Sequence, residues 1–256
     1  MSIEFKVEDG VAVITLNRPD KKNAMLLAMR DQLAELCERV NDDSAIRVAI
    51  LTGAGTDFCA GADVSEMAKG GIDGSLFRAR HMHKAITALG RVQKPLIGAV
   101  RGVALGMGLS MALACDVLLA TETLRIGCVQ RKIGLSPDAG NVWFLTRYLG
   151  VARARELVFS ARMVGAQEAA ALGLVGRLVA DAQLMDEAMA AARSFADGPT
   201  LALGAAKRMF DRASALSLDE FMDLEGTVVP LVAQSEDFRE GTRAFLEKRP
   251  PKFVGN

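Results

Sequence analysis

Apolar residues in the first half of the chain follow two periodicities. An alternating pattern on both sides of Asp9-Gly10 predicts a hairpin, and later apolar runs bounded by glycine or proline predict single strands. Between them, apolar residues recur at the spacing of one helix face. The expected strands are residues 3–8, 11–16, 48–53, 95–100 and 117–120, and the expected helices are residues 26–40, 76–92 and 106–114. This alternation predicts an α/β fold with a parallel sheet built from βαβ units.

The pattern changes character after about Phe144. Helical spacing then dominates, and the one strand-like run is residues 174–179. The expected helices are residues 151–159, 166–171, 181–195, 199–215, 218–233 and 237–248. Because no segment rich in Pro, Gly or Ser separates the two parts, we expect an α/β core that continues into a helical C-terminal region around one shared core.

Composition and charge narrow the classes of partner. The chain carries 31 Lys and Arg against 31 Asp and Glu, so no net positive field favours nucleic acid. No apolar run is long enough for a membrane span, and the N-terminus alternates like a strand, so we expect a cytoplasmic protein without a membrane partner. Cysteines without paired short spacings predict buried, reduced thiols and neither disulfides nor a metal site; they are Cys37, Cys59, Cys115 and Cys128.

Two turns of small residues give the strongest indication of chemistry. Residues 57–64 and residues 102–110 each follow an apolar strand and lead into a helical pattern. Peptide N–H groups at a helix start are unpaired and carry partial positive charge. Two such turns facing one point therefore predict an oxyanion hole, a site that polarises a carbonyl group. The alternative is a structural turn in which Asp63 serves as an N-cap.

The glycines near these turns do not match a nucleotide-binding motif. After Gly106 and Gly108, the dinucleotide fingerprint requires a third glycine at the position of Met111. A similar pair before the first turn has Phe58 at that third position. The chain also has no Gly-Lys-Ser or Gly-Lys-Thr triplet, which excludes a P-loop.

Several short motifs occur in a fixed order along nearly the whole chain. They are residues 16–19 with 23–24, both turns above, and residues 115–116, 133–140, 171–175, 237–241 and 245–249. Together they resemble the crotonase, or enoyl-CoA hydratase/isomerase, family, and within it the enoyl-CoA isomerase branch. The resemblance implies a crotonase-like ββα spiral core over residues 1–195. Residues 196–256 would be a helical trimerisation region that caps the site, giving a homo-trimer or hexamer.

The resemblance also implies an acyl-CoA thioester substrate, with coenzyme A part of that substrate and no separate cofactor or metal. The peptide N–H groups of Ala62 and Met107 would hold the thioester oxygen. Most relatives have glycine where Met107 stands, but methionine can serve because only the backbone donates. Further contacts with coenzyme A or the acyl group are expected at Lys22, Ala24, Ala60, Asp63, Val64, Gly106, Gln130 and Trp143. Apart from the resemblance, a lone lysine such as Lys22 is usually a solvated surface residue.

The acid/base residues depart from the hydratase pattern. Where typical hydratases have two glutamates, this chain has Ser110 and Gln130, and neither group takes up a proton near neutral pH. His81 and His83 belong to a helix remote from both turns in the motif order. Asp138 is the carboxylate left in the right neighbourhood. It is either an N-cap or, as the isomerase and dehalogenase branches imply, a catalytic group.

The sequence therefore favours an enoyl-CoA isomerase. Asp138 would take a proton from C2 of the thioester and return it to C4, and one carboxylate is enough for that transfer. Its apolar neighbours Trp143 and Phe144 favour a raised pKa for its carboxyl group. A hydratase with a rearranged acid/base set is the second hypothesis. A non-catalytic acyl-CoA binder is the third.

Overall fold

The computed structural model describes residues 2–67 and 70–256 and contains one large twisted sheet. In this sheet β2 pairs antiparallel with β1 and parallel with β3, and every later pairing is parallel. Its order is β1 (Ile3–Glu8), β2 (Val11–Leu16), β3 (Val48–Gly53), β4 (Leu96–Val100), β6 (Val117–Thr121) and β9 (Arg177–Val179). The expected hairpin and parallel strands are confirmed, although the strand expected at 174–179 is limited to its last three residues.

A second, smaller sheet lies beside the large one. It consists of β5 (Val103–Leu105), β7 (Arg125–Gly127) and β8 (Val164–Gly165), in that order. The chain passes from β4 to β5 and from β6 to β7. Each repeat of the spiral therefore adds one strand to the large sheet and one to the small sheet before a helix follows. This arrangement is the ββα spiral that the resemblance implied, although the strands of the small sheet were not among those expected from the periodicity.

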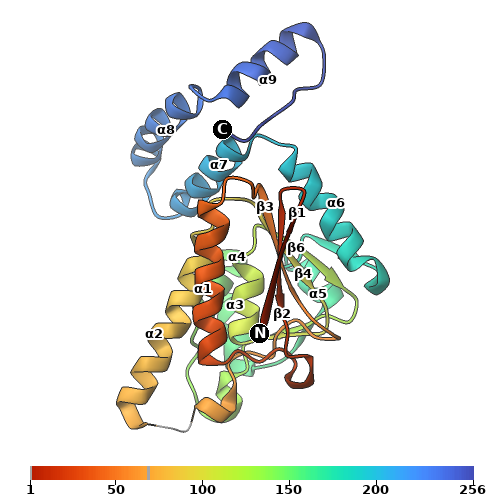
Figure 1. Cartoon of the computed structure of the whole chain (residues 1–256). Coiled ribbons are helices and arrows are strands. Elements are labelled where there is room, and N and C mark those ends of the chain that lie inside the picture. Colours follow the sequence, from red (N-terminus) through yellow and green to blue (C-terminus); the bar gives the residue numbers. More distant parts are fainter. Residues whose placement is uncertain (1, 68–69) are drawn as a thin grey trace.

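Helices cover both faces of the large sheet. On one face lie α1 (Leu27–Asp42), α2 (Gly71–Gly90) and α3 (Met107–Leu113), and α1 and α2 run side by side (Figure 1). Helix α6 (Leu184–Ala196) covers the other face through small residues such as Ala188 and Ala192, which pack on Ile50 and Ile97. The remaining core elements are α5 (Ala166–Ala171) and the 3-10 helices η1 (Pro19–Lys21), η2 (Val64–Glu66), η3 (Gln130–Ile133) and η4 (Asp181–Gln183).

Two helices begin earlier than the periodicity predicts. Helix α2 begins at Gly71 instead of residue 76, and its first buried residue is Met82. Its first turns contain exposed apolar residues, but glycines at 70, 71 and 74 are poor helix formers and hid the start of the helix. The helix expected at 151–159 is the second half of α4 (Asn141–Ser160), which bends at Gly150 with φ of 73°. Positive φ is easily reached by glycine, which accounts for the bend at this position.

The last three helices form an arm that extends from the body of the molecule (Figure 1). The arm consists of α7 (Thr200–Ala213), α8 (Leu218–Val232) and α9 (Glu236–Glu247), and α8 has no buried residue. Many apolar side chains of the arm are exposed: Leu201, Phe210, Leu218, Met222, Val229, Leu231, Phe238, Phe245 and Leu246. The division expected between residues 195 and 196 falls at the end of α6 and stays a prediction. Within the described ranges, no helix combines the length and the apolar character that crossing a bilayer requires.

Candidate active site

The first small-residue turn is fixed between two other segments of the chain. Cys59 forms a parallel bridge with Ala104, and Ala62 forms another with Met25. The Met25 carbonyl accepts the N–H of Asp63 at 3.1 Å. These pairings extend the small sheet through residues 59–62, so the backbone of the turn has little freedom to move.

The second turn lies directly against the first. A Cβ atom added at Gly61 would lie 3.0 Å from the Leu105 carbonyl oxygen and 3.8 Å from the Met107 nitrogen. A Cβ atom at Gly108 would lie 2.2 Å from the Cys59 carbonyl oxygen. Both glycines therefore permit a backbone approach that any side chain would prevent.

The peptide N–H groups of Ala62 and Met107 are both free. Neither group donates a hydrogen bond to a protein acceptor within residues 2–67 and 70–256. Met107 is 1% exposed, and a buried N–H group without a partner is rare because it loses its hydrogen bond to water. Two unpaired donors on adjoining turns are suited to receive one oxygen atom of a ligand.

One sequence expectation about these turns is wrong. The first turn leads only into η2, which has three residues, and α2 does not begin until Gly71. Ala62 is thus not at the start of a long helix, and no macrodipole adds to its donor strength. The second turn does lead into an α-helix, α3, which begins at Met107. The donor at Ala62 is an isolated peptide group set by strand-like pairing.

A chain of side-chain hydrogen bonds connects the Asp138 carboxylate to the second turn. Gln130 Nε2 donates to Asp138 Oδ1 at 2.8 Å and to Asn141 Oδ1 at 2.7 Å. Asn141 Nδ2 donates in turn to the Gly106 carbonyl at 2.8 Å and to Ser110 Oγ. Gln130, Asn141 and Ser110 are buried, whereas Asp138 is half-buried. Asp138 is the one ionisable carboxyl group of this network.

Asn141 is the member of the network that sequence reasoning missed. The Gly106 carbonyl belongs to the same peptide group as the Met107 N–H. A hydrogen bond accepted by that carbonyl polarises the peptide group and strengthens its N–H as a donor. Asn141 also fixes the first residue of α4 to the first turn of α3. Its position at a helix start, directly after a glycine, gives no sign of this contact.

The N-cap interpretation of Asp138 is wrong. The residue before α4 is Gly140, which has φ of 80°, and no side chain caps that helix. The Asp138 carbonyl oxygen accepts the Asn141 N–H at 3.0 Å, but its carboxylate accepts from Gln130. The carboxylate is therefore held by the polar network and not by a helix end.

Comparison with known proteins agrees with this geometry. Residues 6–256 match the family model described as enoyl-CoA hydratase/isomerase. The chain belongs to the enoyl-CoA hydratase/isomerase family. It is 37% identical over 254 residues to a probable enoyl-CoA hydratase of Rhodobacter capsulatus, with 99% of this chain and 98% of that protein covered.

Relatives in this family differ in their named reaction. The chain is 38% identical over 253 residues to the 1,2-epoxyphenylacetyl-CoA isomerase of Escherichia coli, covering 97% of each chain. The crystal structure of an enoyl-CoA hydratase from Bacillus anthracis superposes with a TM-score of 0.95 at 32% identity and covers 100% of both chains. Fold and family are thus shown, and the choice between isomerisation and hydration depends on the site itself.

The residues expected to border coenzyme A lie together at the edge of the first turn. The Ala60 N–H donates to the Lys22 carbonyl at 2.9 Å, and Arg18 Nη1 donates to both the Ala24 carbonyl and Asp63. Lys22 Nζ is 3.5 Å from Asp57 Oδ2, and the Lys22 side chain is 59% exposed. Lys22 is thus largely exposed but paired with Asp57, and its contact with coenzyme A stays a prediction.

Asp63 has the capping role that the sequence suggested. Its carboxylate accepts the Ser65 N–H at 3.0 Å and so caps η2. Hydrogen bonds from Ser65 and from Arg18 hold the pKa of the Asp63 carboxyl group below its usual range. Val64, which follows it, is exposed. Asp63 and Val64 thus border the turn, and their contact with coenzyme A stays a prediction.

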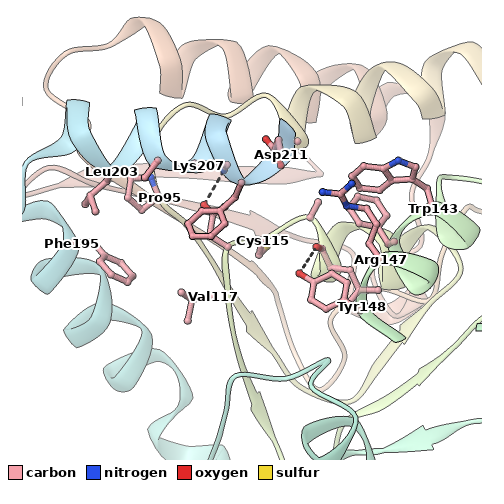
Figure 2. Close-up of a pocket in the computed structure, with 17 residues that line it drawn as sticks. Pro95, Cys115, Val117, Trp143, Arg147, Tyr148, Phe195, Leu203, Lys207 and Asp211 are labelled. Atoms are coloured by element: carbon pink, nitrogen blue, oxygen red, sulfur yellow. Dashed lines mark hydrogen bonds and ion pairs between the residues drawn. The ribbon is translucent and has the colours of Figure 1, made fainter. Parts of the chain in front are cut away.

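A large cavity lies near the other end of α3 (Figure 2). It has a volume of about 690 Å³ and is lined by α4, α6 and α7 besides the end of α3. An ion pair of 2.8 Å between Lys207 and Asp116 crosses part of it. Trp143 and Arg147, which stack at 4.4 Å, line both this cavity and a smaller one beside Asp138. Trp143 thus lies at the border between the candidate acid/base group and the larger cavity.

All four cysteines are free and buried, as the sequence predicts. Burial raises the pKa of the Cys37 and Cys59 thiols to about 12 and that of Cys128 to about 11, and it raises the pKa of Cys115 as well. We therefore expect the native protein to resist a thiol-specific reagent at pH 8, because the reactive thiolate is scarce and covered. In denaturant all four should react. Rapid labelling of the native protein would contradict this assignment.

Proposed function

We propose that the protein is an enoyl-CoA isomerase that converts a 3-enoyl-CoA into a 2-enoyl-CoA. The thioester oxygen accepts hydrogen bonds from the N–H groups of Ala62 and Met107. Asp138 removes a proton from C2, and the electron pair of the broken C–H bond moves into an enolate whose charge rests on that oxygen. The same carboxyl group returns the proton to C4, and the double bond moves to C2–C3. Protons and electrons balance without a cofactor.

The observation that carries this proposal is the path of hydrogen bonds from Asp138 to the peptide group of Gly106 and Met107. A carboxylate and an oxyanion donor that belong to one rigid network have a fixed separation. The distance between the carboxylate and a thioester bound at that donor is therefore fixed as well. General acid/base transfer requires such fixed geometry before it requires a suitable pKa.

The polar groups at the two glutamate positions of hydratases support isomerisation over hydration. Ser110 accepts a hydrogen bond from Asn141, and Gln130 donates to Asp138. Both are neutral and already paired, so neither supplies the base that activates water. Hydration nevertheless stays the second candidate, because the Rhodobacter relative is named a probable hydratase.

Two substrates separate the candidate functions. Purified protein is incubated with 3-hexenoyl-CoA and with crotonyl-CoA, and the products are resolved by chromatography. Isomerisation predicts conversion of 3-hexenoyl-CoA to 2-hexenoyl-CoA and little hydration of crotonyl-CoA. Brisk hydration without a double-bond shift would establish the hydratase. If neither reaction occurs but acyl-CoA binds, the protein is a non-catalytic binder.

We also propose that the C-terminal arm joins copies of the chain into a trimer or a hexamer. Helix α8 buries no residue in a single chain, and the exposed apolar set of the arm is larger than a soluble monomer usually presents. Light scattering at micromolar concentration should give three or six times the chain mass of 27.3 kDa. A monomeric mass would contradict the proposal.

A further inference from the structure

Arg30 is a buried cation that forms no ion pair with a side chain of residues 2–67 or 70–256. It lies on α1, is 2% exposed and is the bulkiest fully buried side chain of the described residues. Its Nη2 donates to the Met25 carbonyl at 3.1 Å and its Nη1 to the Arg78 carbonyl at 3.4 Å. Its Nε has no hydrogen-bond partner within the part of the chain described. Both hydrogen bonds of this guanidinium that form within the described residues are thus to backbone carbonyls.

The position of Arg30 is beside the proposed reacting centre. Met25, whose carbonyl it contacts, is the residue that bridges Ala62. The charges of Glu66 and Asp138 both act on the guanidinium, and the guanidinium acts on Cys59 in the first turn. Through the Met25 carbonyl, Arg30 is therefore tied to the segment that pairs with the first turn.

Burial of this charge lowers the free energy of unfolding of the protein. Desolvation lowers the pKa of Arg30, and the nearby carboxylates offset only part of that effect. A buried charge without a paired counter-ion destabilises a fold, and an apolar residue of similar size is often better. A guanidinium that has an unpaired N–H group, and that is hydrogen-bonded to the segment holding the Ala62 turn, is suited to bind an anionic oxygen. Its fork of donors matches a carboxylate in particular.

We propose that Arg30 binds a carboxylate carried by the acyl chain of the substrate. This inference rests on the proposed thioester site, because the position of the thioester determines which part of the acyl chain reaches α1. The substrate class is then an enoyl-CoA derived from a dicarboxylic acid. The competing role for Arg30, an electrostatic effect on Asp138 alone, is an outcome of the test.

The test measures binding of two unreactive thioesters by calorimetry. One is hexanoyl-CoA, and the other is the monothioester of adipic acid with coenzyme A, which has the same number of acyl carbons and a terminal carboxylate. The wild-type protein should bind the carboxylated thioester about 10- to 100-fold more tightly, as expected for charge-assisted hydrogen bonds. Arg30→Met should abolish that preference and leave hexanoyl-CoA binding nearly unchanged.

Controls separate this inference from the proposed isomerisation. Arg39→Met removes an exposed arginine from the same helix and should keep the preference. Arg30→Gln, which retains a donor for the Met25 carbonyl, is the second variant if Arg30→Met folds poorly. Equal affinities in the wild type, or a preference that survives both Arg30 variants, would overturn the proposal. Because saturated thioesters do not react, a failure of isomerisation leaves this result unaffected.

Discussion

Asp138→Asn is expected to lower isomerisation of 3-hexenoyl-CoA by about 10²- to 10⁴-fold, the usual contribution of a general acid/base group. Asparagine has the same size, and its carbonyl oxygen still accepts the hydrogen bond of 2.8 Å that Gln130 donates to the carboxylate. It cannot take up the C2 proton, however. The melting temperature should therefore stay nearly unchanged while kcat falls. Steady-state kinetics and a thermal melt of the same sample provide both measurements.

Glu122→Gln is the matched control for this variant. Glu122 is an exposed carboxylate in the turn after β6, outside the polar network of Asp138. Its loss should change neither activity nor stability. If Asp138→Asn keeps wild-type turnover but melts at a lower temperature, the Asp138 carboxylate is a structural member of the network and another group moves the proton.

Met107→Pro is expected to cost about 2.7–4 kcal/mol of transition-state stabilisation, or about 10²- to 10³-fold in kcat, because it removes one donor of the oxyanion hole. Met107 is the first residue of α3, a position where proline fits a helix well. The substitution therefore removes the N–H group with little demand on the helix. Kinetics with 3-hexenoyl-CoA measure the loss.

Met107→Ala separates the backbone from the side chain. It keeps the N–H group and removes the side chain, so it should retain most of the kcat that Met107→Pro loses. It should instead lower the free energy of unfolding, because Met107 is 1% exposed and removal of its side chain leaves a cavity. Circular dichroism of both variants shows whether the fold is intact. A folded Met107→Pro protein with full turnover would contradict the oxyanion role.

Most strands of the large sheet and the two small-residue turns could be predicted from the sequence because their signals are local, whereas the three short strands of the small sheet were missed. Alternation in residues 3–16 is enough to place the hairpin at Asp9-Gly10. Small residues next to apolar strands are enough to place the turns. The structure places the two turns against each other at Gly61, and the oxyanion role expected of them stays a prediction.

The support of the site could not be predicted in the same way. Asn141 follows a helix start and Arg30 lies on an amphipathic helix, and neither context indicates a buried polar contact. Asn141 reaches Gly106 across 35 positions of the chain, and Arg30 reaches the Arg78 carbonyl across 48. Such contacts depend on how the helices pack against one another. A single sequence contains no periodic pattern that reveals this packing. Asp138 could be singled out from the sequence, but the hydrogen bonds that hold its carboxylate could not.

The bridges of the first turn also constrain how the protein folds. Met25, Ala62 and Ala104 belong to three segments that are far apart along the chain, and the turn has its final shape only when all three are paired. Contacts with such long sequence separation form late, because loop closure costs entropy before pairing offsets it. We therefore expect the two turns to come together only near the end of folding. A partly folded chain in which these bridges have not formed should therefore lack the proposed oxyanion hole.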